Sequence, residues 1–318
     1  MQPVPKTYRA VCFDLDGTLL PMDLELFMER YFGSIYAFAA EHGLDAKAFM
    51  TGLKAGTKAM ATSDEGVTNA DAFWNTMLEF VGGEEESWTK LLEEFYAGVF
   101  TTVGEGIVAD PAAARAVRTL REKGYTLALT TMPMFPPIAV AERLRWANID
   151  AADFARLTTY DNSKSAKPRQ TYYAENLAAL GVRGEDVLMV GNNTVEDLSF
   201  MDLGADAYLI TDNLIDPIGY DLDSIKHGSM AEFASWVETL PACQSPAVNV
   251  NAGVVATEDM ERAFAENAVR EIDREEGVRK AGNVIDDPTY ERAKGGESKI
   301  DSFGTKAGFG EGAEGGVE

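Results

Sequence analysis

Short apolar runs recur along the chain and are separated by segments with helical periodicity. A strand that is buried on both faces of a parallel sheet reads as an apolar run of this kind. The runs that we predict as strands lie near residues 10–14, 126–131, 157–160, 187–191 and 207–211. Because strands that alternate with helices are typical of a doubly wound parallel sheet, the pattern predicts an α/β fold of the Rossmann-like type.

The segment between the first two runs has a different pattern, in which apolar residues recur at the three- and four-residue spacing of helices. Four such stretches lie between residues 22 and 103, and the first runs from Leu24 to Phe38. Successive amphipathic stretches of this length predict a small helical bundle. We therefore expect an α/β core made of residues 1–21 and 104–242, with a helical subdomain inserted at 22–103.

The composition changes again near the end of the chain. Residues 245–256 are small and polar with several valines, and a single helix pattern begins at Thr257. The sequence that follows is charged and Gly-rich, and such a composition cannot offset the entropy of ordering. We expect 243–318 to be an acidic, Gly-rich and largely disordered extension with one helix near 257–276, which either docks on the core or binds a protein partner.

The clearest candidate site follows the first apolar run. Asp14 and Asp16 stand one residue apart at the end of that run, and Gly17 follows them. Open α/β sheets bind ligands at the carboxyl ends of their strands, and glycine allows the chain to turn sharply there. Two neighbouring carboxylates repel each other unless a cation or a proton separates them. We therefore expect a metal ion or proton-transfer chemistry at this point.

The stretch 10–18 resembles the first motif of the haloacid-dehalogenase-like (HAD) hydrolases, most of which are Mg²⁺-dependent phosphotransferases. The predicted helical insertion lies where members of this superfamily carry a helical C1 cap, which closes over the active site and selects the substrate. The segments 19–23, 56–60 and 211–212 are similar to a bacterial branch of the superfamily. The resemblance implies a hydrolase of the phosphatase type with a C1 cap.

The next two motifs of the superfamily are carried by a hydroxyl and by a lysine. Thr131 follows the second apolar run, and its spacing to Pro133 favours it over Thr130. Lys167 precedes a proline, as in the superfamily motif, and is favoured over Lys164. The resemblance implies that the threonine and the lysine bind the phosphoryl group and stabilise the charge of the transition state.

The last motif supplies metal contacts in the superfamily and corresponds here to residues 191–197. Asn193 stands where an Asp is expected, whereas Asp197 is kept. Because hard cations prefer charged oxygen ligands, this change removes one negative charge from the site. The resemblance implies a weakly bound Mg²⁺ in contact with Asp14, the backbone carbonyl of Asp16, Asn193 and Asp197.

These residues imply the hydrolysis of a small phosphorylated metabolite. Asp14 would attack phosphorus to form an aspartyl-phosphate, and Asp16 would protonate the leaving oxygen and then deprotonate water. Asp16 also favours a phosphatase over the true haloacid dehalogenases, which lack this acid. Asn193, and Met132 in place of the Asn that is usual in the superfamily, favour the alternative of a non-catalytic protein that binds a phosphorylated ligand or a protein partner.

Composition limits the partners and the compartment. The formal net charge of −24 argues against binding to nucleic acid or to an anionic membrane surface, and the sequence has no apolar run long enough to span a membrane. Cys12 and Cys243 are far apart and give neither a disulfide framework nor a zinc spacing. Because the first residues also lack the apolar core of a signal peptide, we expect a cytoplasmic protein.

Overall fold

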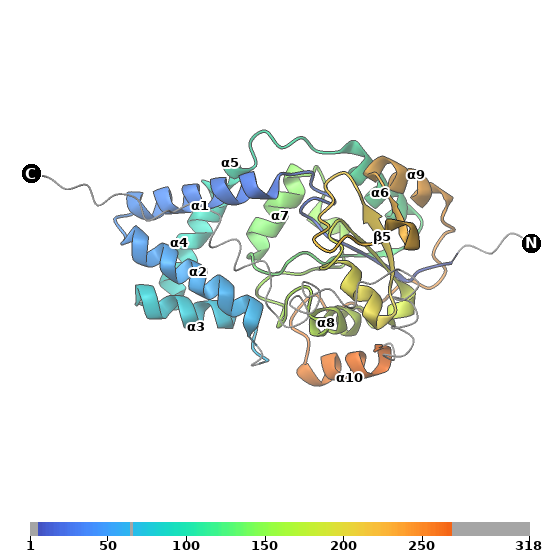
Figure 1. Cartoon of the computed structure of the whole chain (residues 1–318). Helices are drawn as coiled ribbons and strands as arrows, with labels where there is room; N and C mark the ends of the chain where they lie inside the picture. Colours follow the sequence, from blue (N-terminus) through green and yellow to red (C-terminus); the bar gives the residue numbers. More distant parts are fainter. Residues whose placement is uncertain (1–5, 64–65, 269–318) are drawn as a thin grey trace, which may run out of the picture.

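The computed structural model of the chain describes residues 6–63 and 66–268, and a six-stranded sheet lies at its centre (Figure 1). The strands are β1 (Ala10–Phe13), β2 (Thr126–Leu129), β3 (Arg156–Leu157), β4 (Val187–Gly191), β5 (Asp206–Ile210) and β6 (Lys226–Gly228). Their order in the sheet is β3-β2-β1-β4-β5-β6, and every neighbouring pair is parallel. This arrangement confirms the predicted doubly wound α/β fold.

Two strands differ from the prediction. The third strand was expected at 157–160 but ends at Leu157, because the Asn162 side chain closes a turn beside it. Its Nδ2 donates to the carbonyl of Leu157 at 2.8 Å, and its Oδ1 accepts from the amide of Thr159 at 2.9 Å. The sequence analysis missed β6, a three-residue edge strand whose first two residues are exposed and which therefore contains no apolar run.

Alternate side chains of the strands enter two hydrophobic cores, one on each face of the sheet. In β1, Val11 and Phe13 belong to the first core, whereas Ala10 and Cys12 belong to the second. The first face is covered by α6 (Pro111–Glu122), α7 (Pro137–Trp146) and α9 (Met230–Thr239), and the second by α8 (Gln170–Leu180). Burial on both faces explains why the strand sequences are apolar without alternation.

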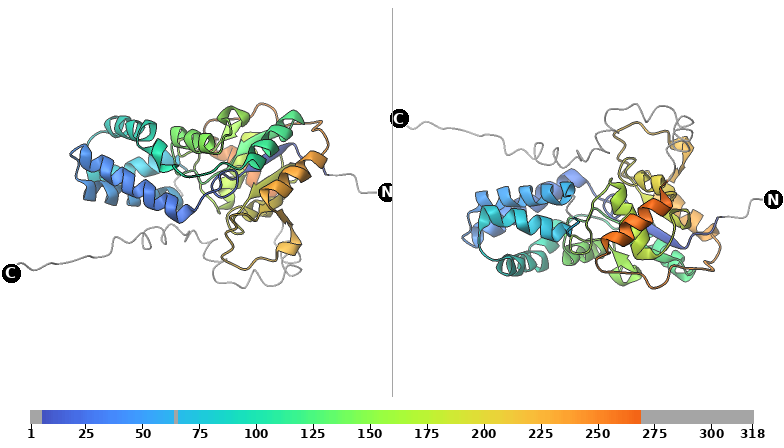
Figure 2. Two further views of the ribbon diagram at one scale, coloured as in Figure 1. Left: turned by 90° about the horizontal axis from the view of Figure 1, so that it is seen from above. Right: turned by 90° about the horizontal axis from the view of Figure 1, so that it is seen from below.

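The chain between β1 and β2 first forms a set of helices that projects from one side of the sheet domain (Figures 1 and 2). We call this set the helical insertion; it comprises α1 (Leu24–Glu41), α2 (Ala46–Thr62), α3 (Asn69–Val81), α4 (Glu85–Ala97) and the short α5 (Phe100–Val103). Asp23, Asp45 and Thr68 cap the first three helices by accepting backbone N–H groups. No helix in the described part of the chain is both long and apolar enough to cross a membrane.

The start of α3 attaches the helical insertion to the sheet domain. The buried Asn69 donates through Nδ2 to the carbonyls of Pro133 and Ser165, at 3.0 and 3.1 Å. The amide of Ala70 donates to the carbonyl of Tyr160 at 2.9 Å. These carbonyls belong to the loops that follow β2 and β3, so the helical insertion is held over the carboxyl edge of the sheet.

The helix predicted near 257–276 is described as α10 (Thr257–Asn267), and it packs against α8 (Figure 1). Val255 and Met260 are buried there against Ala179. The sequence left open whether this helix docks on the core or binds a protein partner. Its described part docks on the core.

The segment before α10 also lies against the core, although the sequence set it apart as an extension. The buried Arg156 guanidinium donates to the carbonyls of Asn251 and Gly253, at 2.8 and 2.9 Å. A buried cation requires such acceptors, and this segment supplies them. The rest of the predicted extension, residues 269–318, lies outside the described residues.

Two glycines within helices of the insertion are expected to respond in opposite ways to the same substitution. A Cβ on Gly56 of α2 would lie 2.6 Å from the Phe73 ring, whereas a Cβ on Gly33 of α1 would meet no heavy atom within 4 Å. Gly33→Ala should raise the free energy of unfolding by about 0.5–1 kcal/mol, because alanine restricts the unfolded chain. Gly56→Ala should lower it by about 1–3 kcal/mol, because α3 must move away from α2. Chemical denaturation measures both, and equal losses in the two variants would contradict the described packing.

Candidate active site

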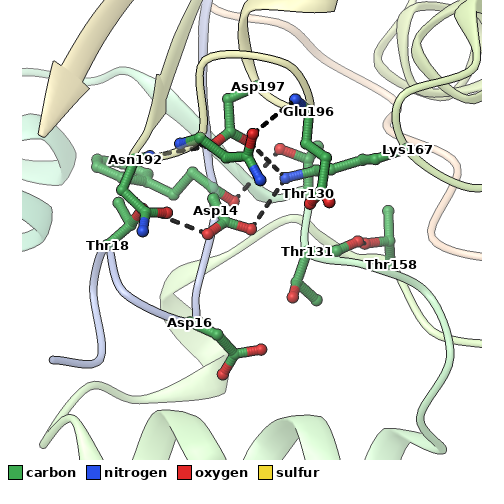
Figure 3. Close-up of polar contacts among 12 residues, drawn as sticks. Asp14, Asp16, Thr18, Thr130, Thr131, Thr158, Lys167, Asn192, Glu196 and Asp197 are labelled. Atoms are coloured by element: carbon green, nitrogen blue, oxygen red, sulfur yellow. Dashed lines mark hydrogen bonds and ion pairs between the residues drawn. The ribbon is translucent and has the colours of Figure 1, made fainter. Parts of the chain in front are cut away.

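Asp14 lies at the carboxyl end of β1, in the middle of the sheet (Figure 3). The residue before it, Phe13, is in register with Leu129 of β2 and with Val190 of β4. The loops that follow these three strands therefore begin side by side. This alignment brings residues from distant parts of the sequence together at one edge of the sheet.

The Lys167 ammonium lies between two carboxylates (Figure 3). It donates to Asp14 Oδ1 at 2.9 Å and to Asp197 Oδ1 at 2.6 Å, and all three side chains are buried. Burial by itself lowers the pKa of Lys167, but the two carboxylates more than reverse this effect, so its pKa lies well above the ordinary value and the lysine is charged. The alternative, Lys164, donates instead to Thr257 Oγ1 at 3.0 Å on the surface.

The second oxygen of Asp197 organises the turn after β4. Asp197 Oδ2 accepts from the backbone amides of Asn192 and Asn193, each at 2.9 Å. The carboxylate reaches these amides only because Gly191 has no side chain, since a Cβ there would lie 2.1 Å from Oδ2. Burial raises the pKa of Asp197, and the Lys167 ammonium opposes this rise. Both oxygens of Asp197 are thus engaged within the protein.

The turn after β4 places Asn192, rather than Asn193, at the Thr18 hydroxyl that also contacts Asp14. The Thr18 hydroxyl lies 3.1 Å from Asn192 Oδ1 and 3.3 Å from Asp14 Oδ2. Asn193 Oδ1 accepts instead from two backbone amides of its own turn, at 3.0 Å each. Gly17, with φ of 86°, makes room for Asn192, because a Cβ on Gly17 would lie 2.3 Å from Asn192 Nδ2. The sequence analysis missed Asn192, although it directly follows the strand.

The Asp16 carboxyl lies apart from the cluster around Lys167 (Figure 3). It forms an ion pair with Arg143 of α7, whose side chain is buried against the Phe135 ring. Burial raises the pKa of Asp16, Arg143 offsets part of this rise, and the nearby Asp14 carboxylate adds to it. A carboxyl group whose pKa is raised can hold a proton closer to neutral pH and exchange it. The sequence analysis missed Arg143, which belongs to no motif.

Of the two candidate threonines, only Thr131 faces the site. Its side chain lines the cavity described below, and its backbone carbonyl accepts from the hydroxyls of Thr158 and Tyr172, at 2.9 and 2.8 Å. The Thr130 hydroxyl donates instead to the carbonyl of Phe13 at 3.3 Å, inside the sheet. The structure therefore places the favoured candidate at the site.

A cavity of about 180 Å³ lies between the carboxyl edge of the sheet and the helical insertion. Of the residues predicted from the sequence, those that line it are Asp14, Asp16, Thr131 and Asn193. Lys167 and Asp197 are not part of its lining: Lys167 contacts the lining residue Asp14, and Asp197 accepts from the amides of the lining residues Asn192 and Asn193. The site therefore has an inner charged layer and an outer layer that can touch a ligand.

The oxygen atoms around Asp14 form a sparse donor set for a cation. Within residues 6–63 and 66–268, no group of three or more His, Cys, Asp or Glu side chains is arranged to hold a metal ion. Asp14 supplies one carboxylate, and Asn192 supplies a neutral oxygen that is linked to it through the Thr18 hydroxyl. The loop after β1 adds the backbone carbonyl of Asp16. Mg²⁺ commonly uses one or two carboxylates and completes its shell with water and substrate phosphate. The oxygen donors thus suit Mg²⁺ in type, but together they carry little negative charge.

Comparison with known proteins gives the family. The family model of the haloacid dehalogenase-like hydrolases matches residues 8–201. Similar solved structures include a HAD phosphatase from Thermococcus onnurineus, with 18% identity, a TM-score of 0.43 and coverage of 76% of this chain and 100% of the other. A 2-haloacid dehalogenase from Pseudomonas syringae has 15% identity and a TM-score of 0.49, with coverage of 72% of this chain and 97% of the other. The search of curated proteins found no match. Because the family match spans more than half of the sequence and includes Asp14, Lys167 and Asp197, the chain belongs to the haloacid dehalogenase-like hydrolases.

Proposed function

We propose that this hydrolase is a Mg²⁺-dependent phosphatase that cleaves a phosphomonoester of a small metabolite through an aspartyl-phosphate on Asp14. The observation that carries the proposal is the half-buried Asp16 carboxyl, which lies in the cavity wall in an ion pair with Arg143 and whose pKa is raised by partial burial. An ester oxygen leaves as an alkoxide and needs a proton, whereas a halide leaves without one. Asp16 therefore supports the cleavage of a phosphate ester rather than of a carbon–halogen bond.

In the first half of the proposed reaction, an oxygen of Asp14 forms a bond to phosphorus while the bond from phosphorus to the leaving oxygen breaks. Asp16 transfers its proton to that oxygen, so the product leaves as a neutral alcohol. Lys167 holds Asp14 Oδ1 at 2.9 Å and reduces the repulsion between the carboxylate and the anionic phosphoryl group. The Thr131 hydroxyl, in the cavity wall, donates to a phosphoryl oxygen.

In the second half, Asp16 acts as a carboxylate. It takes a proton from water, whose oxygen bonds to phosphorus as the bond to Asp14 breaks, and inorganic phosphate is released. Arg143 forms an ion pair with Asp16 and stabilises this charged form between the two steps. The ion pair and the burial of Asp16 act in opposite directions, so the carboxyl can serve both as acid and as base.

Asp14, the backbone carbonyl of Asp16 and Asn192 are the residues that would hold Mg²⁺. When bound, the ion offsets the negative charge that Asp14 and the phosphoryl group bring together. Because Asn192 is neutral, we expect the affinity for Mg²⁺ to be lower than that of a site with two carboxylates.

A protein that binds a phosphorylated ligand without cleaving it is the second candidate. It is favoured by the full engagement of both Asp197 oxygens and by the neutral Asn192. Such a protein has no use, however, for a proton-donating carboxyl in the cavity wall beside Asp14. Asp16 is therefore the reason to favour the phosphatase.

Replacement of the nucleophile tests the proposed function. Asp14→Asn should lower the turnover of para-nitrophenyl phosphate by roughly 10³-fold or more, because the amide cannot form the covalent intermediate. The assay compares the wild type and the variant over a Mg²⁺ titration, with thermal unfolding as a control for folding. Equal traces of activity in both proteins would favour the binding protein, and release of halide from 2-chloropropionate by the wild type alone would favour a dehalogenase.

A matched pair of variants tests which asparagine adjoins the metal. Asn192→Asp should lower the Mg²⁺ concentration for half-saturation about tenfold or more, because it adds a charged oxygen beside Asp14. Asn193→Asp should leave this concentration within about twofold, since a carboxylate can accept the same two backbone amides. Calorimetric titration with Mg²⁺ measures binding independently of turnover. The reverse ranking of the two variants would show that Asn193 adjoins the metal.

The pH profile tests the role of Arg143. Arg143→Met removes the guanidinium that lowers the pKa of Asp16, so this pKa should rise further and the acid should remain protonated to higher pH. The alkaline limb of kcat/KM should then move upward by roughly one to three pH units. Arg145→Met is the control, because Arg145 lies on the same helix, is exposed and pairs with Glu142. An unchanged limb in Arg143→Met would mean that Asp16 is not the group that titrates.

A further inference from the structure

The described residues of the helical insertion contribute only uncharged side chains to the cavity. Apolar side chains from its first three helices line the wall that faces Asp14: Leu24, Phe27, Met28, Leu53, Met60 and Phe73. In the described part of the insertion, no Lys, Arg, His, Asp or Glu is among the lining residues. A second charged group on a substrate would therefore lose its hydration at this wall without gaining a partner.

The polar atoms on this wall already have partners within the insertion. The hydroxyls of Tyr31 and Tyr96 form a hydrogen bond with each other at 2.9 Å, and both side chains are buried. Burial raises the pKa of Tyr31 to about 12, so this pair is neutral at physiological pH. The Thr57 hydroxyl donates to the carbonyl of Leu53 at 2.8 Å. The wall thus offers a substrate mainly apolar contact.

The charged residues of the cavity lie on the opposite side, on the sheet domain. They are Asp14, Asp16, Arg143 and Glu196. The cation among them, Arg143, is paired with Asp16. An anionic group on the leaving part of a substrate would therefore meet carboxylates and an arginine whose charge Asp16 already balances, although Nε and Nη2 of this buried arginine have no hydrogen-bond partner among the described residues.

The volume of the cavity limits the size of the ligand. A benzene molecule fills an engineered apolar cavity of about 150 Å³, and the cavity here measures about 180 Å³. The space beside the apolar wall is thus of the right size for a phosphoryl group at Asp14 and a leaving group of a few carbon atoms.

We infer, on the basis of the proposed phosphatase function, that the substrate is a phosphate monoester of a small, uncharged and apolar alcohol or phenol. Selectivity then comes from the apolar wall of the insertion, which excludes esters whose leaving group carries a carboxylate or a second phosphate. Phosphorylated acids are poor substrates by the same argument, and sugar phosphates are poor substrates because their hydroxyl groups would lose hydration at the apolar wall without gaining partners.

Two esters of nearly equal shape test this inference. Isobutyl phosphate and phosphoglycolate share a branched skeleton and a primary leaving oxygen, but one ends in two methyl groups and the other in a carboxylate. We expect kcat/KM to be at least about tenfold higher for isobutyl phosphate, because the apolar wall favours the methyl groups. An equal or higher kcat/KM for phosphoglycolate would overturn the inference.

A binding measurement separates this inference from the proposed function. Isobutylphosphonate and phosphonoacetate are analogues of the two esters that cannot be hydrolysed, and calorimetry in the presence of Mg²⁺ gives their affinities. Tighter binding of isobutylphosphonate supports the inference even if neither ester is turned over, an outcome that would refute the phosphatase alone. Tighter binding of phosphonoacetate, or no binding of either analogue, overturns the inference.

A lysine introduced into the wall should reverse the preference. Met28 of α1 is half-buried and lines the cavity, so Met28→Lys places an ammonium near the leaving group with little disturbance of the core. We expect the ratio of kcat/KM for isobutyl phosphate over phosphoglycolate to fall about tenfold. Leu26→Lys on the same helix is the control, because Leu26 is 43% exposed and lies outside the cavity lining. If both variants keep the wild-type ratio, the wall does not select the substrate.

Discussion

The buried Lys167 ammonium between Asp14 and Asp197 is the contact on which the rest of the site depends. An ammonium taken out of water costs several kcal/mol unless opposite charges and hydrogen bonds compensate for its lost hydration. The two carboxylates that compensate come from the end of β1 and from the turn after β4, whereas the lysine comes from the loop after β3. Neutralising this charge therefore fixes three loops against one another, and it requires the strand register that the sheet provides.

Because Lys167 pairs with Asp14 and Asp197, the two carboxyls of the β1 loop, Asp14 and Asp16, have different electrostatic environments. Asp14 belongs to the Lys167 cluster, whereas Asp16, two positions further along the loop, faces Arg143 in an environment that raises its pKa. Two carboxyls in different surroundings can take different roles at one pH, as nucleophile and as proton donor. The groups are held by buried partners before any ligand arrives, so they need little reorganisation during a reaction.

The fold and the inner layer of the site could be predicted from the sequence because buried strands have a recognisable apolar sequence. Strands covered on both faces are apolar runs in the sequence. Asp14 and Lys167 lie in motifs that are recognisable from Gly17 and Pro168. The sequence did not show which of Asn192 and Asn193 faces Asp14. The conformation of this turn decides it, and that conformation is held by the hydrogen bonds from two backbone amides to the Asp197 carboxylate. Arg143 was missed because an arginine on an amphipathic helix ordinarily lies on the surface. Its burial depends on Asp16, which is distant in sequence.

The charge of the whole chain adds a constraint on how a substrate is bound. A formal net charge of −24 opposes the approach of a phosphate dianion at long range. Contact with the apolar wall of the helical insertion adds binding free energy that does not depend on charge. The charged layer around Lys167 is buried behind Asp14, and its field would act on the phosphoryl group of the proposed substrate over a short distance and in a low dielectric. In the proposed phosphatase, binding by the wall and stabilisation of the transition state by the inner layer are thus separated in space, which would let an acidic protein act on an acidic substrate.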